Sequence, residues 1–147
     1  MIPWTNKLLV IMKGYLLLEQ PFVIGEGVFA PSDASENNYS GVFEDDGDTG
    51  YFYAAERIDG PDGMRILDAL HIYNVDEIAA EERQAVLKII WSRDWLKCAL
   101  IINGYCHAVF DFDRHGGYNR NEFPPPNEVW TVGDRVLTDE MIAALFG

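Results

Sequence analysis

Three apolar segments follow one another between residues 86 and 113, and short polar pairs separate them. Their order is VLKIIWS, then RD, then WLKCALII, then NG, then YCHAVFDFD. Asn103-Gly104 is a two-residue turn signal, because both central positions of a tight type I′ hairpin turn need positive φ. The pattern therefore predicts three antiparallel strands joined by two tight turns.

If both turns hold an even number of residues, strand alternation sorts the side chains of this unit onto two faces. The first face should be core and carries Leu87, Ile89, Trp91, Leu96, Cys98, Leu100, Ile102, Tyr105, His107 and Val109. The second face carries Val86, Lys88, Ile90, Lys97, Ala99, Ile101, Cys106, Ala108, Phe110 and Phe112. Because the second face is also apolar toward Phe112, a helix, the N-terminal segment or a second subunit must cover part of it. The third cover would make the protein a homodimer.

The two cysteines fall on opposite faces in this register. Cys98 and Cys106 therefore cannot form a disulfide, and two cysteines are too few for a disulfide-framed secreted domain. A three-residue bulged loop at the Asn103-Gly104 turn would shift the parity and reopen the question.

The chain before residue 86 contains further strand patterns and one ambiguous stretch. Strands are predicted over residues 22–30 and 64–74, with a hairpin of arms 42–44 and 51–55 around the turn 45–50 and a polar loop at 31–41. Residues 76–84 fit a helix that runs on into IIWS or, as we prefer, a short helical turn followed by a strand. The apolar stretch 8–18 is shorter than the roughly 20 residues that span a bilayer, so it is expected to be a buried strand or short helix.

The C-terminal residues carry helix signals. Thr138 is a good N-cap, and Asp139 and Glu140 after it suit the positive end of the helix dipole. The apolar stripe that follows consists of Met141, Ile142, Leu145 and Phe146, so this short helix should pack on the sheet. The elements predict an α+β fold, a mainly antiparallel β-meander sheet with a short C-terminal helix packed on it. We expect one domain over residues 1–147, with residues 1–11 as an extension if translation starts at Met12.

Composition and charge restrict the function classes. The chain has 147 residues, 48% of them hydrophobic, which is too apolar for a disordered acidic tail, and its net charge is −13. Such an acidic balance disfavours nucleic-acid binding and docking to anionic membranes, and it permits a basic protein partner. No signal peptide is evident, so the expected location is cytoplasmic.

The negative charge is concentrated in one part of the sequence. Residues 14–56 contain nine acids and no lysine or arginine. We therefore expect a partner-binding surface formed by Glu44, Asp45, Asp46 and Asp48 together with Tyr39, Tyr51 and Tyr53, since an acidic field steers cationic partners and interfaces favour tyrosine. The first hypothesis is a non-enzymatic protein-binding module, in its most concrete form an immunity-type inhibitor of a basic toxin.

The polar segment 113–126 supports a second hypothesis. It gathers hydrogen-bond donors in one loop, and loops often carry function. A small-molecule or anion-binding protein, or an enzyme, would use the 111–121 region through His107, Asp111, Arg114, His115, Tyr118 and Arg120.

Metal, cofactor and nucleophile chemistry have little support in the sequence. His107, Asp111, Asp113 and His115 share strand parity but span roughly 26 Å at about 3.3 Å per residue, too far for one ion. The turn at 44–50 lacks the residue order of a calcium loop, and the chain has no G-x-S-x-G elbow and no phosphate-binding glycine motif. We therefore expect no metal and no cofactor.

Three strings give a family resemblance over residues 42–124: GYFYA at 50–54, HIYN at 71–74 and HAVFDF at 107–112. With these strings the chain resembles a small bacterial family catalogued as domain of unknown function twenty-two fifty-one. The resemblance implies a compact bacterial intracellular domain, and it assigns no catalytic or binding residue.

Overall fold

A computed structural model describes residues 12–60 and 63–147. Antiparallel β-strands are its main elements. The elements in chain order are β1 (Tyr15–Val23), β2 (Val28–Asp33), β3 (Tyr39–Asp45), β4 (Thr49–Arg57), β5 (Met64–Asn74), the 3₁₀ turns η2 (Val75–Glu77) and η3 (Ala80–Glu82), β6 (Gln84–Trp91), β7 (Lys97–Ile102), β8 (Tyr105–Asp111), β9 (Gly116–Asn119) and helix α1 (Asp139–Phe146). The α+β class and the mainly antiparallel pairing predicted from the sequence are confirmed. No helix within the described residues has the length and apolar character needed to cross a membrane.

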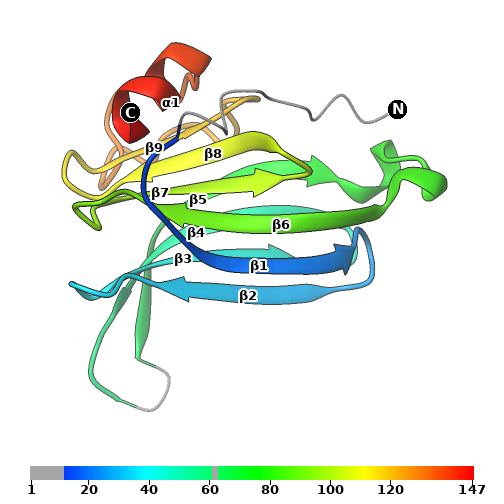
Figure 1. Cartoon of the computed structure of the whole chain (residues 1–147), viewed down its shortest axis with the longest axis horizontal. Helices are drawn as coiled ribbons and strands as arrows, with labels where there is room; N and C mark the ends of the chain where they lie inside the picture. The colour runs from blue at the N-terminus through cyan, green and yellow to red at the C-terminus, as the bar shows by residue number, and fades with distance from the viewer. Residues whose placement is uncertain (1–11, 61–62) are drawn as a thin grey trace.

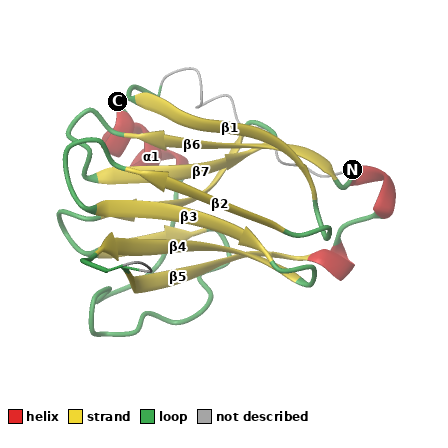
Figure 2. Cartoon of the chain, turned by 90° about the horizontal axis from the view of Figure 1, so that it is seen from below, coloured by secondary structure: helices red, strands yellow, loops and turns green. Residues whose placement is uncertain are grey.

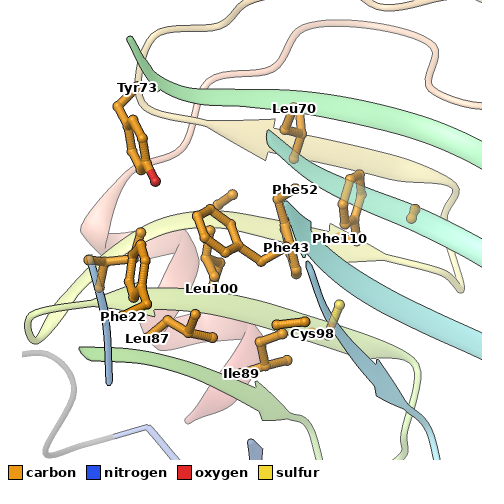
Figure 3. Close-up of a cluster of buried hydrophobic side chains, with 14 of the residues drawn as sticks. Phe22, Phe43, Phe52, Leu70, Tyr73, Leu87, Ile89, Cys98, Leu100 and Phe110 are labelled. Atoms are coloured by element: carbon orange, nitrogen blue, oxygen red, sulfur yellow. The ribbon is translucent and has the colours of Figure 1, made fainter. Parts of the chain in front are cut away.

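The strands form two sheets that pack face to face. One sheet has the order β1-β6-β7-β8-β9 and the other β2-β3-β4-β5, with antiparallel neighbours throughout. In Figure 1 the two sheets lie as layers, and α1 lies on the face of the five-stranded sheet that points away from the four-stranded sheet. Leucines and aromatic rings from both sheets meet between the layers, among them Phe43, Phe52, Leu100 and Phe110 (Figure 3). The core is therefore shared between the sheets.

The strand predicted over residues 22–30 is wrong, because a turn at residues 24–27 divides it into β1 and β2. Gly25 and Gly27 adopt φ of 95° and 84°, which glycine tolerates best, and the chain crosses there from one sheet to the other. Apolar residues continue on both sides of the turn, so the alternation looks unbroken in the sequence. The polar loop predicted at 31–41 is also shorter than expected, since β2 extends to Asp33 and β3 begins at Tyr39.

The three antiparallel strands β6, β7 and β8 are confirmed, but the first turn is longer than the predicted Arg93-Asp94 pair, since β6 ends at Trp91 and β7 begins at Lys97. The predicted side-chain parity is wrong beyond Cys106. The turn between β7 and β8 holds two residues, Asn103 and Gly104, as predicted. Further along, Ile101 pairs with Cys106 and Leu100 with Ala108, so His107 is an extra residue in a β-bulge. The bulge turns Ala108, Phe110 and Phe112 into the core between the sheets, the face that holds Leu87, Ile89 and Trp91. Cys98 and Cys106 still face opposite ways, and both are free thiols.

Helix α1 covers the outer face of the five-stranded sheet. The Thr138 hydroxyl caps it by accepting a hydrogen bond from the Met141 amide at 3.1 Å, as predicted. Ile142 and Phe146 are buried against Ala99, Ile101, Cys106 and Val109. Helix α1 is one of the three covers considered for this face, and Met12 from the N-terminal segment packs on the same cluster.

Two other expectations have clear outcomes. Residues 64–74 form β5, and residues 75–82 form two short 3₁₀ turns before β6, as preferred. Part of the apolar stretch 8–18 lies outside the described residues. Its remainder enters β1, where Tyr15, Leu16 and Leu17 are 44%, 51% and 42% exposed, so the expected burial is wrong there.

A buried ion pair ties the chain after β9 to β5. The Arg135 guanidinium donates to both carboxylate oxygens of Asp68 at 2.8 Å, and the Thr131 hydroxyl adds a third hydrogen bond at 2.5 Å. The side chains of Asp68 and Arg135 are 3% and 1% exposed. Arg135 also donates to the carbonyls of Pro124 and Gly117, so its charge is well compensated.

Asp68→Asn should lower the free energy of unfolding by about 3–5 kcal/mol, because it leaves the buried Arg135 charge without its counterion. Urea denaturation measures the change. Glu19→Gln is the control, since Glu19 lies 3.7 Å from Lys88 in an exposed pair that contributes about 1 kcal/mol or less. Small, equal changes in the two variants would contradict the role of Asp68.

Candidate functional site

The hairpin between β3 and β4 carries the acids expected to contact a partner, and one of them is buried. Asp45 is 2% exposed, and its carboxylate accepts hydrogen bonds from the Gly25 amide at 2.8 Å, the Gly47 amide at 2.8 Å and the Tyr73 hydroxyl at 2.6 Å. Burial, followed by the bond to Asp45, raises the pKa of Tyr73. Asp45 thus fastens three segments together, and we remove it from the partner-contact set.

Asp46 and Asp48 are exposed at the tip of the same hairpin. The Asp46 carboxylate accepts the amides of Thr49 at 2.8 Å and Asp48 at 2.9 Å. These bonds, the one from Thr49 above all, lower the pKa of Asp46 below its ordinary value. The tip is therefore an ordered turn that presents carboxylates to solvent.

Segments from elsewhere in the sequence bring more carboxylates to this tip. The Val75 amide donates to the Asp48 carbonyl at 2.8 Å, which places η2 and its acids Asp76 and Glu77 beside the hairpin. A hollow of about 400 Å³ lies between them, lined by Gly47, Asp48, Asn74, Val75, Asp76, Glu77 and Arg83. The β1–β2 turn, with exposed Glu26, lies alongside, as Figure 2 shows for this end of the sheets. We call Glu26, Asp46, Asp48, Asp76 and Glu77 the acidic end.

The base lining this hollow is committed to backbone groups. Arg83 donates from Nε to the Ile78 carbonyl at 3.0 Å and from Nη2 to the Val75 carbonyl at 3.2 Å. Its position holds the 75–83 segment in place, while the five carboxylates around it are exposed. Arg83 keeps its positive charge, but five carboxylates outnumber it, so the acidic end has a negative potential.

The nine acids of residues 14–56 do not share this surface. The Glu19 carboxylate lies 3.7 Å from Lys88 Nζ, and the Asp33 carboxylate lies 3.4 Å from Arg57 Nη1. Glu56 forms an ion pair with Arg65. Paired charges on other parts of the sheets contribute little to the field at the hairpin tip. The acidic end combines three acids from residues 14–56 with two from η2. Because these segments are separated in the sequence, the sequence alone does not identify this surface.

The three tyrosines of the expected contact set divide between the two faces of the four-stranded sheet. Tyr39 stacks on Phe112 at 4.5 Å between ring centroids and belongs to the core edge, so we remove it from the contact set. Tyr51 and Tyr53 lie on the outer face, with ring centroids 6.0 Å apart. The Tyr53 hydroxyl donates to Glu44 at 3.1 Å, and burial together with this bond raises the pKa of Tyr53 to about 12.

Sequence reasoning missed three rings that extend this outer face. Cross-strand pairing sets Phe29 opposite Glu44, Glu44 opposite Tyr51, and Tyr51 opposite His71. Phe123 follows, with its ring 5.9 Å from that of His71. We call Phe29, Glu44, Tyr51, His71 and Phe123 the aromatic row. Phe29 was the one member that sequence reasoning could have identified, as an outward-facing residue of β2. The prediction of a single strand over residues 22–30 obscured its position.

The six residues of the second hypothesis separate into two groups. His107 and Asp111 lie four residues apart on β8, about 13 Å at 3.3 Å per residue. Arg120 belongs with His107: it lies over the Tyr105 ring at 4.7 Å and donates to the carbonyls of Cys106 and Leu137 and to the Asp139 carboxylate. His107 is buried beside Tyr105, and burial, with a smaller effect of Arg120, lowers its pKa to about 3.

The other group surrounds the turn after β8. The Asp111 carboxylate is buried and accepts the amides of Asp113 and Arg114 at 3.0 and 3.1 Å. His115 stacks on Trp130 at 5.1 Å, and burial raises the pKa of Tyr118. These contacts fix the turn and leave Arg114 apart from Arg120, so the six side chains do not converge on one ligand.

Reactive and metal-binding groups are likewise dispersed in the part of the chain that the structure describes. No group of three or more His, Cys, Asp or Glu side chains there could hold a metal ion. Burial raises the pKa of the Cys98 thiol, and it raises that of Cys106 to about 12, so neither is a thiolate near neutral pH.

Comparisons with known proteins match the sequence to a bacterial protein family. The sequence profile of a family described as "Uncharacterized protein conserved in bacteria" matches residues 22–146. A protein of Haemophilus influenzae, named "Uncharacterized protein", is 40% identical over 132 residues, covering 84% of this chain and 80% of its own. No solved structure matches the chain significantly.

Asp45→Asn should lower the free energy of unfolding by about 2–3 kcal/mol, because it weakens charge-assisted hydrogen bonds inside the protein. Asp48→Asn, three residues further along the same hairpin and exposed, should change it by about 0.5 kcal/mol or less. Urea denaturation compares the two. A neutral Asp45→Asn would contradict the fastening role.

The burial of His107 predicts that the free energy of unfolding decreases as the pH is lowered. An ordinary histidine has a pKa of 6.5, and His107 in the folded protein has one near 3, so between these values the unfolded chain binds the extra proton. This contribution is fully present above pH 6.5 and is lost as the pH falls toward 3. The loss should reach about 2 kcal/mol at pH 5.

His107→Leu should therefore lose less stability between pH 7 and pH 5 than the wild type in urea denaturation. Ile66→Ala, at a 53% exposed position without a titratable side chain, is the control and should keep the wild-type slope. An unchanged slope in His107→Leu would count against a neutral buried imidazole.

Proposed function

Since the chain belongs to the bacterial family domain of unknown function twenty-two fifty-one, whose description names no activity, we propose from its surface that it is a non-enzymatic protein-binding module for a basic protein. The observation that carries the proposal is the acidic end. Five exposed carboxylates from three separate segments gather there, and the arginine among them is bonded to backbone carbonyls. Such a surface attracts a cationic partner over a distance of about a Debye length.

The rigidity of the acidic end supports a docking role. Asp45 bonds the hairpin to the β1–β2 turn and to Tyr73 of β5, and Arg83 holds the segment that contains η2. Carboxylates on ordered segments lose little conformational entropy when a partner binds. A partner with lysines or arginines in matching positions would thus associate quickly, at a rate that falls with added salt.

In its most specific form, the proposal is an immunity-type inhibitor that neutralises a basic toxin. Its support is the combination of small size, net charge of −13 and an acidic end on a stiff frame. The proposed partner is met in the cytoplasm, where the toxin would act. A toxin encoded next to this gene is the first candidate partner.

The proposal predicts that binding depends on the position of the negative charges. A quadruple variant of the acidic end, Glu26→Gln, Asp48→Asn, Asp76→Asn and Glu77→Gln, should weaken binding of the neighbouring basic gene product about tenfold or more at low salt. A matched variant elsewhere, Glu36→Gln, Asp59→Asn, Asp113→Asn and Glu140→Gln, has the same net charge. It should bind within about twofold of the wild type.

Isothermal titration calorimetry at 50 and 200 mM salt measures both variants. A nona-lysine peptide serves as the charge probe beside the gene product. Equal losses in the two quadruple variants would show that net charge alone matters, and the acidic end would then have no special role. In cells, neutralisation of the toxin by the wild type but not by the acidic-end variant tests the immunity-type form.

A further inference from the structure

We propose that the aromatic row is an arginine-binding surface, the part of the interface that selects arginine over lysine in the basic partner. This inference rests on the proposed function and names the chemistry that the partner must present. The occupant is an arginine-bearing protein segment that lies across β2, β3, β4 and β5 beside the acidic end.

The row is continuous across the whole sheet. Strand register alone aligns Phe29, Glu44, Tyr51 and His71, one on each of the four strands. The loop after β9 completes it, since the Phe123 carbonyl accepts the His71 amide at 3.0 Å and so places the Phe123 ring at the end of the row. In Figure 2 no helix of the described residues crosses β3 and β4 on this side, whereas α1 covers the opposite side of the molecule.

The rings are open to solvent to an extent unusual for phenylalanine. Phe29 is 61% exposed and Phe123 is 52% exposed, while Tyr51 and Tyr53 between them are half-buried. Single exposed apolar residues are common on protein surfaces, but contiguous exposed rings indicate an interaction site. Tyrosines held by packing also lose little entropy when a partner covers them.

The charge on the row favours a cation. Glu44 lies between Phe29 and Tyr51, and its carboxylate accepts the Tyr53 hydroxyl. Both ring nitrogens of His71 have hydrogen-bond partners beside the row, since Asn121 Nδ2 lies 2.7 Å from Nδ1 and the Asn74 amide oxygen lies 2.9 Å from Nε2. The Asn121 oxygen accepts the Phe123 amide, which supports this orientation of the Asn121 amide.

The row also joins the acidic end directly. Glu44 and Tyr51 pair one residue inward from the Asp45–Gly50 pair, next to the hairpin tip. Asn74 links the two surfaces, since it bonds His71 through its oxygen and Glu77 through its amide nitrogen. A single basic segment can therefore contact carboxylates at the tip and rings on the face.

Arginine fits this combination better than lysine. A guanidinium is planar and weakly hydrated, so it stacks on a tyrosine face and can bond a carboxylate through two N–H groups at once. A lysine ammonium is a strongly hydrated point charge and gains less from a ring. A second copy of this chain is a poor occupant, because it would bring another net charge of −13 and another Glu44 to the same face.

Nona-arginine and nona-lysine peptides of equal charge provide the test. Titrated into the full chain at 50 mM salt, nona-arginine should bind about two- to fivefold more tightly than nona-lysine for each ring that a guanidinium contacts. Tyr51→Ala and Phe29→Ala should each reduce this ratio toward one. Tyr51→Phe keeps the ring and should keep most of the ratio. Ile66→Ala, at a 53% exposed position of β5, is the matched control and should keep all of it.

The acidic-end quadruple variant separates this inference from the proposed function. It should weaken both peptides to a similar extent and leave their ratio unchanged. Equal binding of the two peptides to the wild type, or an unchanged ratio in Tyr51→Ala with intact circular dichroism, would overturn the arginine-binding surface while the acidic end stands. If neither peptide binds at 50 mM salt, both proposals fail.

Sedimentation velocity of the wild type and Tyr51→Ala gives the remaining outcome. We expect both to be monomers at micromolar concentration. A wild-type dimer that Tyr51→Ala dissociates would mean that the aromatic row pairs with a second copy, and it would overturn the arginine assignment.

Discussion

Burial of two inner sheet faces against each other is the constraint on which the rest of the structure depends. Each strand that contributes to this core places every second side chain between the layers, where Phe43 and Phe52 from one sheet meet Leu100 and Phe110 from the other (Figure 3). The remaining side chains must face outward, and the two outer faces then differ. Helix α1 covers one of them. The other keeps its aromatic rings at the surface, because no further element of the described chain packs on its centre.

Two buried carboxylates show how polar groups are kept within this frame. Asp68 meets a guanidinium, and Asp45 meets two amides and a phenol, so both have hydrogen-bond donors in place of water. Each also joins segments that are far apart in the sequence. Asp68 holds the chain after β9 against β5, and Asp45 holds the hairpin tip. The same residue type therefore fixes structure where it is buried and supplies the external field where it is exposed, as at Asp46 and Asp48.

Short apolar runs bounded by turn residues made most of the strands predictable, because β5 and β6–β8 are each such a run. Strand alternation then predicted which side chains share a face. It could not locate the turn at Gly25 and Gly27 or the bulge at His107, since both depend on the strand with which a segment pairs. The candidate site shows the same limit. The acids at the hairpin tip were identified from a run in the sequence, but the burial of Asp45 follows from contacts with Gly25 and Tyr73. The aromatic row runs across four strands and the loop after β9, so its successive members lie 7 to 52 residues apart and form no local pattern.

Preorganisation connects the core to the proposed role. Asp45 bonds the tip to the interior and Asp46 orders the turn itself, whereas a mobile acidic loop would lose more entropy on binding. Tyr73 donates its hydroxyl to this carboxylate from inside the core, and its ring packs against Phe43, so the position of the tip is set by the same packing that joins the two sheets. A partner would therefore meet carboxylates and rings whose spacing is fixed before contact. It follows that core substitutions near Tyr73 can change binding without touching the binding surface, whereas substitutions under α1, on the other side of the molecule, should change stability alone.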